Sequence, residues 1–446
     1  MKKLTFNYQA QGAQITPVKR AWLIVAVVAV VLIRFSATVC AQETKTHPLF
    51  MLGANDPRGE GKGIFPGRVV WTHAPGTATW DGTTGNWFED RWNNQENCNW
   101  LVQKSLTELT GKTDEAAAWK ALFNYFNKTH GKTGGYKAGE KIAIKINQNN
   151  TYSHANSEET NASPDMVLAL LRSLINKGKV PQNRITVADP SRYITDDIYL
   201  KCSKEFPDVI YLDNSGGDGR TKATYVEKAI PYSANNGNVA QGLAACFVEA
   251  DYVINLALLK GHVGQGVTLC SKNWYGTTSI NADWHKNFHN NFDQERSGKP
   301  KYIIFVDFIG HKDLGQKTIL YLIDGLYGSE NVAGKPSGKW KLKPFNGDWP
   351  NSLFVSQDPI AIDAVGLDFL SSEFPGMVDI DYADAYMVEA ATIPNSPSGT
   401  TYDPEQDGIA LSHSLGVVEH WNNAANKQYS RNMGKKIGIE LIKVEK

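Results

Sequence analysis

The chain has 446 residues, of which 41% are hydrophobic and 11% aromatic, enough apolar side chain for a large folded core. Its 46 Lys and Arg residues balance 46 Asp and Glu residues, so the charge gives no electrostatic reason to expect a nucleic-acid partner. We therefore expect a globular protein that does not bind nucleic acid.

Residues 1–41 are typical of a signal peptide. Lysine and arginine side chains precede the thirteen apolar residues 21–33, a run that is short for a bilayer span of about 20 residues. Val39 and Ala41 stand where signal peptidase reads small residues, which predicts cleavage before Gln42. The alternative is an uncleaved membrane anchor. We predict an exported protein of the periplasm or cell envelope, which contacts the membrane only if this segment is retained.

Residues 42–140 are predicted to form an irregular layer, rich in Trp and Gly, that packs on the core. The glycine-rich stretch 53–68 has no helix after it, as a phosphate-binding loop would require, so we expect an ordinary loop. Five tryptophans favour core packing over sugar stacking: Trp71, Trp80, Trp87, Trp92 and Trp100.

Residues 141–395 alternate between continuous apolar runs and helical patterns. A helix is expected to begin at Ser163 and Pro164 and to end at Gly178, and a second is expected from Asp358. Strands are expected at 141–147, 184–189, 208–213, 249–262, 301–307, 318–324 and 352–357. This alternation predicts an α/β fold with a mostly parallel sheet and helices on both faces. Residues 396–446 are expected to form a loop and an edge strand.

Polar side chains recur where the apolar runs end. They are Asn147, Asp189, Asp213, Asn255, Lys260, His262, Asp307, Asp324 and Asp358. A single Asp or Asn in such a place is a common turn residue. Their repetition indicates a ligand crevice, because ligands of open α/β sheets bind outside the carboxyl ends of the strands.

Several of these side chains are suited to hold negative charge. Lys260 and His262 follow one strand, and Lys145 and Arg192 belong to neighbouring strand ends. Thr268, Lys272 and Asn273 would add hydroxyl, ammonium and amide groups to the same anion. Structural ion pairing with a carboxylate remains an alternative for Lys145 and Lys272. The predicted partner is a small anionic molecule.

A divalent metal is a second hypothesis, and the cofactor is left unknown. His285 and His289 are one helical turn apart and close to Asp283, although a surface loop with ordinary histidines fits this Asn-rich stretch better. Asp358 and Asp363 are further oxygen ligands, but Asp358 also fits a helix N-cap, and Asp363 inside the helix would need a partner such as a lysine of 260–272. The cysteines have no CxxC spacing, so no iron–sulfur cluster is expected.

Six motifs in order carry a family resemblance: IKIN, DPSR, NLALLKGH, TLCSKNWYG, DGLYG and SQDPIAIDAVG. Over roughly residues 50–395 the chain resembles the domain of unknown function 362 family, and its GANDPRGEGKGIFPGRVVWTHAP stretch is similar to the exported bacterial branch. The resemblance implies the same set of polar residues as the site, and it implies no particular activity. Some members of the family bear a ferredoxin-like cysteine motif, which this chain lacks.

These residues fit three functional hypotheses. The leading hypothesis is an enzyme acting on a carboxylated or phosphorylated small molecule such as a sugar, with catalytic residues His262, Lys260 and Asp324. Its substrate-binding residues would be Lys145, Asn147, Asp189, Arg192, Asn255, Thr268, Lys272 and Asn273. The alternatives are an exported binding protein for an anionic or carbohydrate ligand and a structural factor of the cell envelope.

Overall fold

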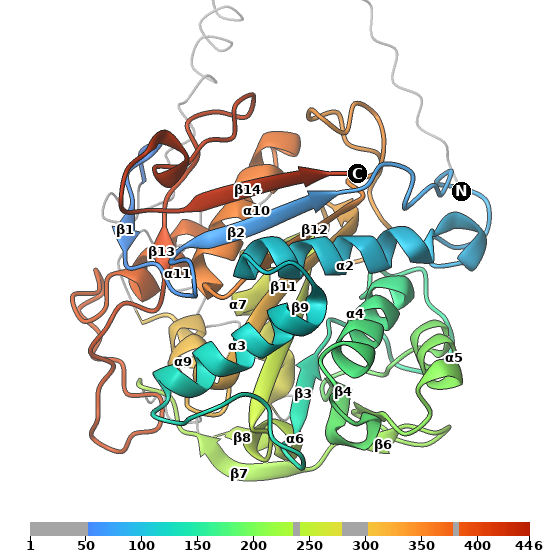
Figure 1. Ribbon diagram of the computed structural model, residues 1–446, viewed down its shortest axis with the longest axis horizontal. Helices are drawn as coiled ribbons and strands as arrows, with labels where there is room; N and C mark the ends of the chain where they lie inside the picture. Colours follow the sequence, from blue (N-terminus) through green and yellow to red (C-terminus); the bar gives the residue numbers. More distant parts are fainter. Residues whose placement is uncertain (1–51, 235–240, 279–301, 378–382) are drawn as a thin grey trace, which may run out of the picture. The chain divides into compact units, whose positions relative to one another are not determined.

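The apolar runs of the sequence form a ten-stranded mixed sheet with helices on both of its faces (Figure 1). The computed structural model describes residues 52–234, 241–278, 302–377 and 383–446. The predicted α/β class with a mostly parallel sheet is confirmed. The predicted signal peptide lies outside the described residues, and no helix within them is long and apolar enough to span a membrane.

Most strands of the large sheet run in one direction. In chain order they are β2 (Arg68–His73), β3 (Ile142–Lys145), β4 (Ile185–Asp189), β5 (Ile210–Asp213), β6 (Thr221–Lys222), β9 (Tyr252–His262), β10 (Gly266–Val267), β11 (Thr318–Ser329), β12 (Ser352–Ser356) and β14 (Glu440–Glu445). Their spatial order is β14-β2-β12-β11-β9-β3-β4-β5-β6, with β10 paired to β9. Only β12 and β10 pair antiparallel within this sheet. Two small sheets pair β1 (Arg58–Gly59) with β13 (Val417–Val418) and β7 (Tyr225–Ile230) with β8 (Gln241–Ala244).

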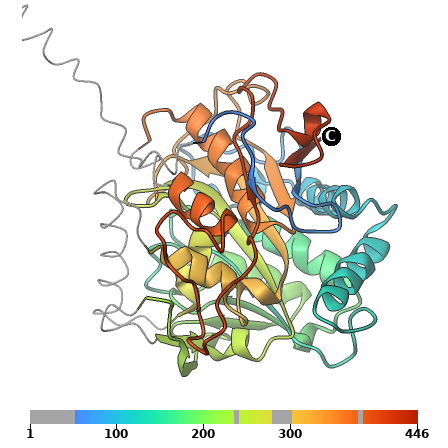
Figure 2. The same cartoon turned by 90° about the vertical axis from the view of Figure 1, so that its left-hand side faces the viewer.

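Two layers of helices lie on opposite sides of the sheet (Figure 2). One layer holds α2 (Gln95–Thr110), α3 (Glu115–Thr129), α4 (Pro164–Asn176) and α5 (Asp196–Glu205). The other holds α7 (Cys270–Asn273), α9 (Ile304–Gly310), α10 (Pro359–Glu373) and α11 (Ala383–Ala391). Shorter helices are α6 (Ala245–Val248) and the 3-10 turns η2 (Asp90–Trp92), η3 (Gln182–Arg184), η4 (Trp274–Thr277), η6 (Gly315–Lys317) and η8 (Arg431–Met433).

Side-chain alternation along the strands builds two separate cores. On β3, Ile142 and Ile144 pack against the layer of α2 and α4, whereas Ala143 faces the layer of α10. On β2, Val70 and Trp71 likewise belong to opposite cores. Both faces of the sheet are therefore buried, which explains why the strands are continuously apolar.

Two expectations about local structure differ from the fold. Residues 301–307 were expected to be a strand, but Ile304–Gly310 form helix α9. Every residue of α9 is buried, and a short, fully buried apolar run has no periodicity that separates a helix from a strand. The N-terminal segment was expected to be irregular, yet it supplies strand β2 and helices α2 and α3.

The predicted C-terminal edge strand is confirmed as β14, which pairs parallel to β2. The N-terminal and C-terminal segments thus add strands to the same sheet. Trp71, Trp80 and Trp87 are buried, and Trp80 stacks on Trp349 with ring centroids 5.9 Å apart. These three rings serve core packing, as expected. The four cysteines of the described residues are free thiols.

Candidate functional site

The chain order of the strands reverses between β3 and β9. From β3 the chain passes through α4 to β4 on one side, and from β9 it passes through α7 and α9 to β11 on the other. The connecting helices consequently lie on opposite faces of the sheet. Such a switch point leaves a crevice at the carboxyl ends of the strands, where open α/β sheets bind their ligands.

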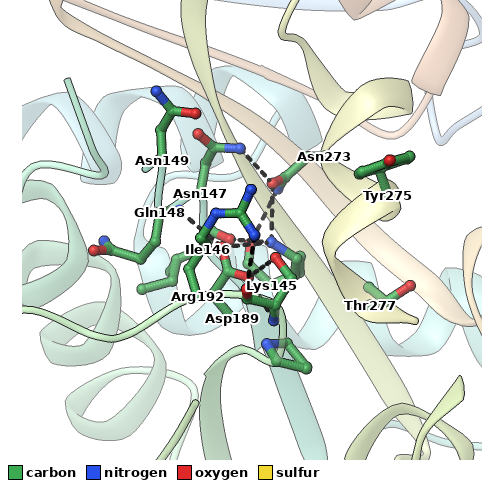
Figure 3. Close-up of polar contacts among 12 residues, drawn as sticks. Lys145, Ile146, Asn147, Gln148, Asn149, Asp189, Arg192, Asn273, Tyr275 and Thr277 are labelled. Carbon is green, nitrogen blue, oxygen red and sulfur yellow. Dashed lines mark hydrogen bonds and ion pairs between the residues drawn. The ribbon is translucent and has the colours of Figure 1, made fainter. Parts of the chain in front are cut away.

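A cavity of about 220 Å³ lies at this switch point. Eight of the predicted site residues line it, namely Lys145, Asn147, Asp189, Arg192, His262, Thr268, Lys272 and Asn273. Figure 3 shows Lys145 and Asp189 at the centre, with Asn147 on one side and Asn273 and Tyr275 on the other. The structure therefore brings together side chains that are up to 128 positions apart in the chain.

A buried ion pair forms the floor of the cavity. The Lys145 ammonium lies 3.1 Å from Asp189 Oδ2, and the two side chains are 1% and 2% exposed. Asp189 also accepts hydrogen bonds from the backbone N–H groups of Gln148 and Ser191 and from the Ser191 hydroxyl. Burial lowers the pKa of Lys145, and the adjacent carboxylate opposes that effect. Lys145 therefore forms the structural ion pair that was the alternative to ligand binding.

The Lys272 side chain has no such carboxylate beside it among the described residues. Its ammonium lies 4.0 Å from the centre of the Tyr275 ring, and the residue is 8% exposed. Within the described part of the chain it forms no hydrogen bond or ion pair. Burial, together with Arg192 and Lys145, lowers its pKa to about 7. Lys272 is thus a buried amine without an ion-pair partner among the described residues.

Arg192 supplies a further cation. Its Nη1 donates to the Ser191 carbonyl over 2.9 Å, and its guanidinium lies 5.5 Å from the Tyr152 ring. No carboxylate pairs with Arg192 in the described residues. The three cations of the cavity, Lys145, Arg192 and Lys272, are therefore opposed only by Asp189 among the charged residues that line it. The site has an excess of positive charge.

His262 lies at the wall of the same cavity and is partly exposed. Its Nδ1 is 2.6 Å from the Val263 carbonyl. A carbonyl oxygen can only accept, so Nδ1 carries the hydrogen. His262 is therefore held in one tautomer at the cavity.

Three predicted site residues do not line the cavity. Lys260 is fully buried and donates to the Thr160 carbonyl over 2.8 Å, and burial lowers its pKa to about 7. Asn255 lies behind the wall, where its Oδ1 accepts from Asn273. Asp324 was expected at a strand end, but β11 continues to Ser329, and the carboxylate accepts from the backbone N–H groups of Ser163 and Leu326. It thereby supports the start of α4.

The prediction that all strand-end residues converge on one edge of the sheet is wrong for Asp358. Strand β12 is antiparallel to its neighbours, so its end lies at the opposite edge of the sheet from the cavity. Asp358 caps α10 by accepting from Ile360 and Ala361, and it also accepts from the backbone N–H groups of Lys62 and Val417. Asp213 is occupied by turn amides and His154, and Asp307 lies in α9.

The metal hypothesis gains no support from the described residues. They contain no group of three or more His, Cys, Asp or Glu side chains suited to hold an ion. Asp283, His285 and His289 lie outside the described residues. Asp358 and Asp363 lie apart, and both are occupied by backbone N–H groups.

Asp363 positions the segment that carries Lys272. Its carboxylate accepts from the backbone N–H groups of Cys270 and Ser271 at the start of α7 and from the Tyr386 hydroxyl. Burial raises its pKa to about 6, although these donors favour the charged form. The expected partner was a lysine of residues 260–272. The partners do come from that segment, but they are backbone amides.

Replacing Asp363 with alanine should lower the free energy of unfolding by about 1–3 kcal/mol, because two buried amides lose their acceptor. It should also weaken anion binding, because α7 carries Lys272. Chemical denaturation and calorimetric titration with sulfate measure the two effects. Asp363→Asn, which keeps one acceptor oxygen, should have intermediate values. Equal stability of the native protein and both variants would contradict this role.

Sequence reasoning missed Gln148, Ser191 and Tyr275, which also line the cavity. Gln148 directly follows Asn147, and Ser191 stands between Asp189 and Arg192, so each adjoins a residue that was identified. Tyr275 belongs to the same motif as Lys272, three residues further on. An aromatic ring beside a lone lysine was the signal that could have revealed it.

A family model described as "Domain of unknown function (DUF362)" matches residues 142–368. The match covers about half of the chain and runs from β3 to α10. All residues that line the cavity lie within it. The comparison with curated proteins gave no match.

Proposed function

The chain belongs to the DUF362 family, whose domain has no known function. We propose that it is an enzyme that acts on a small anionic molecule in the cavity between β3, β4 and β9. The observation that carries this proposal is the Lys272 ammonium, which is buried and forms no ion pair with any of the described residues. Burying a lone cation is costly, and chains keep such groups where a ligand neutralises them. Arg192 adds a second cation that no carboxylate of the described residues pairs with.

The cavity limits the size of the substrate. About 220 Å³ is below the range of drug-sized pockets, so a carboxylated or phosphorylated molecule of few atoms fits best. The walls supply amide groups from Asn147 and Gln148 for orientation. Lys272 and Arg192 would hold the charged group of the substrate.

Proton transfer is the chemistry that these residues support. A lysine whose pKa lies at about 7 exchanges its proton at neutral pH, whereas an arginine does not. Lys272 is therefore the proposed general acid or base, and His262 at the cavity wall is a second candidate. Lys145 and Asp189 fix the floor against which the substrate is oriented.

The predicted signal peptide extends this proposal to location. If residues 1–41 direct export, the enzyme works in the periplasm or cell envelope, as a member of the exported branch of the family. A fusion of residues 1–41 to a reporter that is active only outside the cytoplasm tests this. Activity of the fusion supports export, and its absence contradicts it.

The affinity for sulfate should be constant below pH 7 and should fall above it, by up to tenfold per pH unit. The reason is that Lys272, with a pKa of about 7, must be charged to hold the anion. Isothermal titration between pH 6 and pH 9 measures this slope. Lys272→Arg keeps its charge throughout and should show no such fall. The same slope in Lys272→Arg would contradict the assignment.

Stability should change with pH in the opposite direction. The pKa of Lys272 falls from 10.5 to about 7 on folding, so between these values the unfolded chain binds more protons. The contribution of Lys272 to the free energy of unfolding therefore rises from about pH 7 to pH 10.5. The contribution of Lys260 to the free energy of unfolding also rises over this pH range, because burial lowers its pKa to about 7.

Turnover separates an enzyme from a binding protein. Small carboxylates and phosphates that raise the melting temperature would be incubated with the protein and followed by NMR. Conversion that disappears in Lys272→Met supports the enzyme. Tight binding without conversion of any bound anion would favour the binding protein.

A further inference from the structure

The orientation of the Asn273 side chain is dictated by its charged neighbour. The Lys145 ammonium can only donate, so Asn273 Oδ1, at 3.1 Å, must be the atom that faces it. Asn273 Nδ2 then donates to Asn255 Oδ1 over 2.8 Å and to the Leu256 carbonyl over 3.3 Å. Both ends of the amide have partners, and these partners identify which end is the oxygen and which is the nitrogen.

That assignment determines the orientation of Asn147. Asn273 Oδ1 is an acceptor, so the Asn147 atom 3.1 Å away must be the donor Nδ2. Asn147 Oδ1 therefore points away from Asn273. This oxygen is buried and has no hydrogen-bond partner in the described part of the chain. Asn147 lines the cavity, and its Oδ1 is thus a fixed acceptor that lacks a donor among the described residues.

A ligand can supply the missing donor. Neither Lys272 nor Arg192 donates to this oxygen, and a buried acceptor without a donor is unfavourable. A ligand ammonium would be repelled by the three cations of the cavity, Lys145, Arg192 and Lys272. A neutral hydroxyl group carries the donor without that repulsion.

We infer that the ligand of this site is a hydroxylated anion, whose carboxylate or phosphate group binds Lys272 and Arg192 and whose hydroxyl group donates to Asn147 Oδ1. This inference rests on the proposed anion-binding function and narrows its substrate class. The small cavity requires the hydroxyl to lie within a few bonds of the charged group.

Matched ligands test the inference by isothermal titration. Lactate should bind about tenfold more tightly than propionate, and glycerol phosphate about tenfold more tightly than propyl phosphate, as one net hydrogen bond provides. The two pairs also show whether the charged group is a carboxylate or a phosphate. Alanine, which has an ammonium in place of the hydroxyl, should bind more weakly than lactate.

Asn147→Leu should abolish the preference for the hydroxylated member of each pair while the deoxy member still binds. Asn176, exposed at the end of α4, provides the matched control: Asn176→Leu should keep the preference.

Equal affinities of the native protein for both members of each pair would overturn the inference and leave the proposed function standing. So would a preference that persists in Asn147→Leu. Failure of the native protein to bind any of these anions would overturn both. The native comparison needs no variant, so a misfolded Asn147→Leu would not rescue the inference.

Discussion

Replacing Asp189 with alanine is expected to lower the free energy of unfolding by about 3–5 kcal/mol, because it leaves Lys145 buried without its counter-charge. The two side chains are almost inaccessible to water, so solvent cannot replace the lost carboxylate. The backbone N–H groups of Gln148 and Ser191 lose their acceptor in the same variant. Equilibrium denaturation in urea measures the change.

Two comparisons make this result specific. Lys145→Met should cost less, about 1–3 kcal/mol, because the Asp189 carboxylate keeps its other hydrogen-bond donors. Asp208→Ala, at an exposed position, should change stability by no more than about 0.5 kcal/mol. A loss below about 1 kcal/mol for Asp189→Ala would show that the pair is not a buried ion pair. Anion binding should weaken in both site variants, because the pair forms the floor of the cavity.

Replacing Lys272 with methionine is expected to weaken anion binding by about 2–5 kcal/mol, which corresponds to roughly 30-fold or more. The same variant should be at least as stable as the native protein, because methionine removes a buried cation that forms no ion pair within the described part of the chain. Sulfate titration measures the loss of affinity, and thermal denaturation measures the change in stability.

Lys177→Met provides the control, since Lys177 is exposed at the end of α4. Its sulfate affinity should equal that of the native protein. A loss of several kcal/mol of stability in Lys272→Met would mean that Lys272 has a structural partner, and unchanged sulfate affinity would remove Lys272 from the site. Either result would contradict the proposed function.

Residues 141–147, 184–189 and 249–262 were recognised as strands because each is a bounded apolar run, and α4 and α10 were recognised by their N-terminal signals. The same local reasoning failed for residues 301–307, because Ile304–Gly310 form a fully buried, mostly apolar helix. The error has a physical cause. Burial on every side removes the alternation from which periodicity is read.

The sequence by itself determined which strands point toward the site, because β3, β4 and β9 are parallel strands of α/β units and their carboxyl ends must share an edge. Only the tertiary structure decided which polar residues reach the cavity. The antiparallel pairing of β12 moves Asp358 to the other edge, and the extension of β11 leaves Asp324 within a strand. Strand pairing and strand length depend on contacts between segments far apart in the chain, and no local pattern encodes them. Among the described residues, the same contacts pair Lys145 with a carboxylate and place Lys272 beside an aromatic ring instead, although both are lysines at the same edge of the sheet.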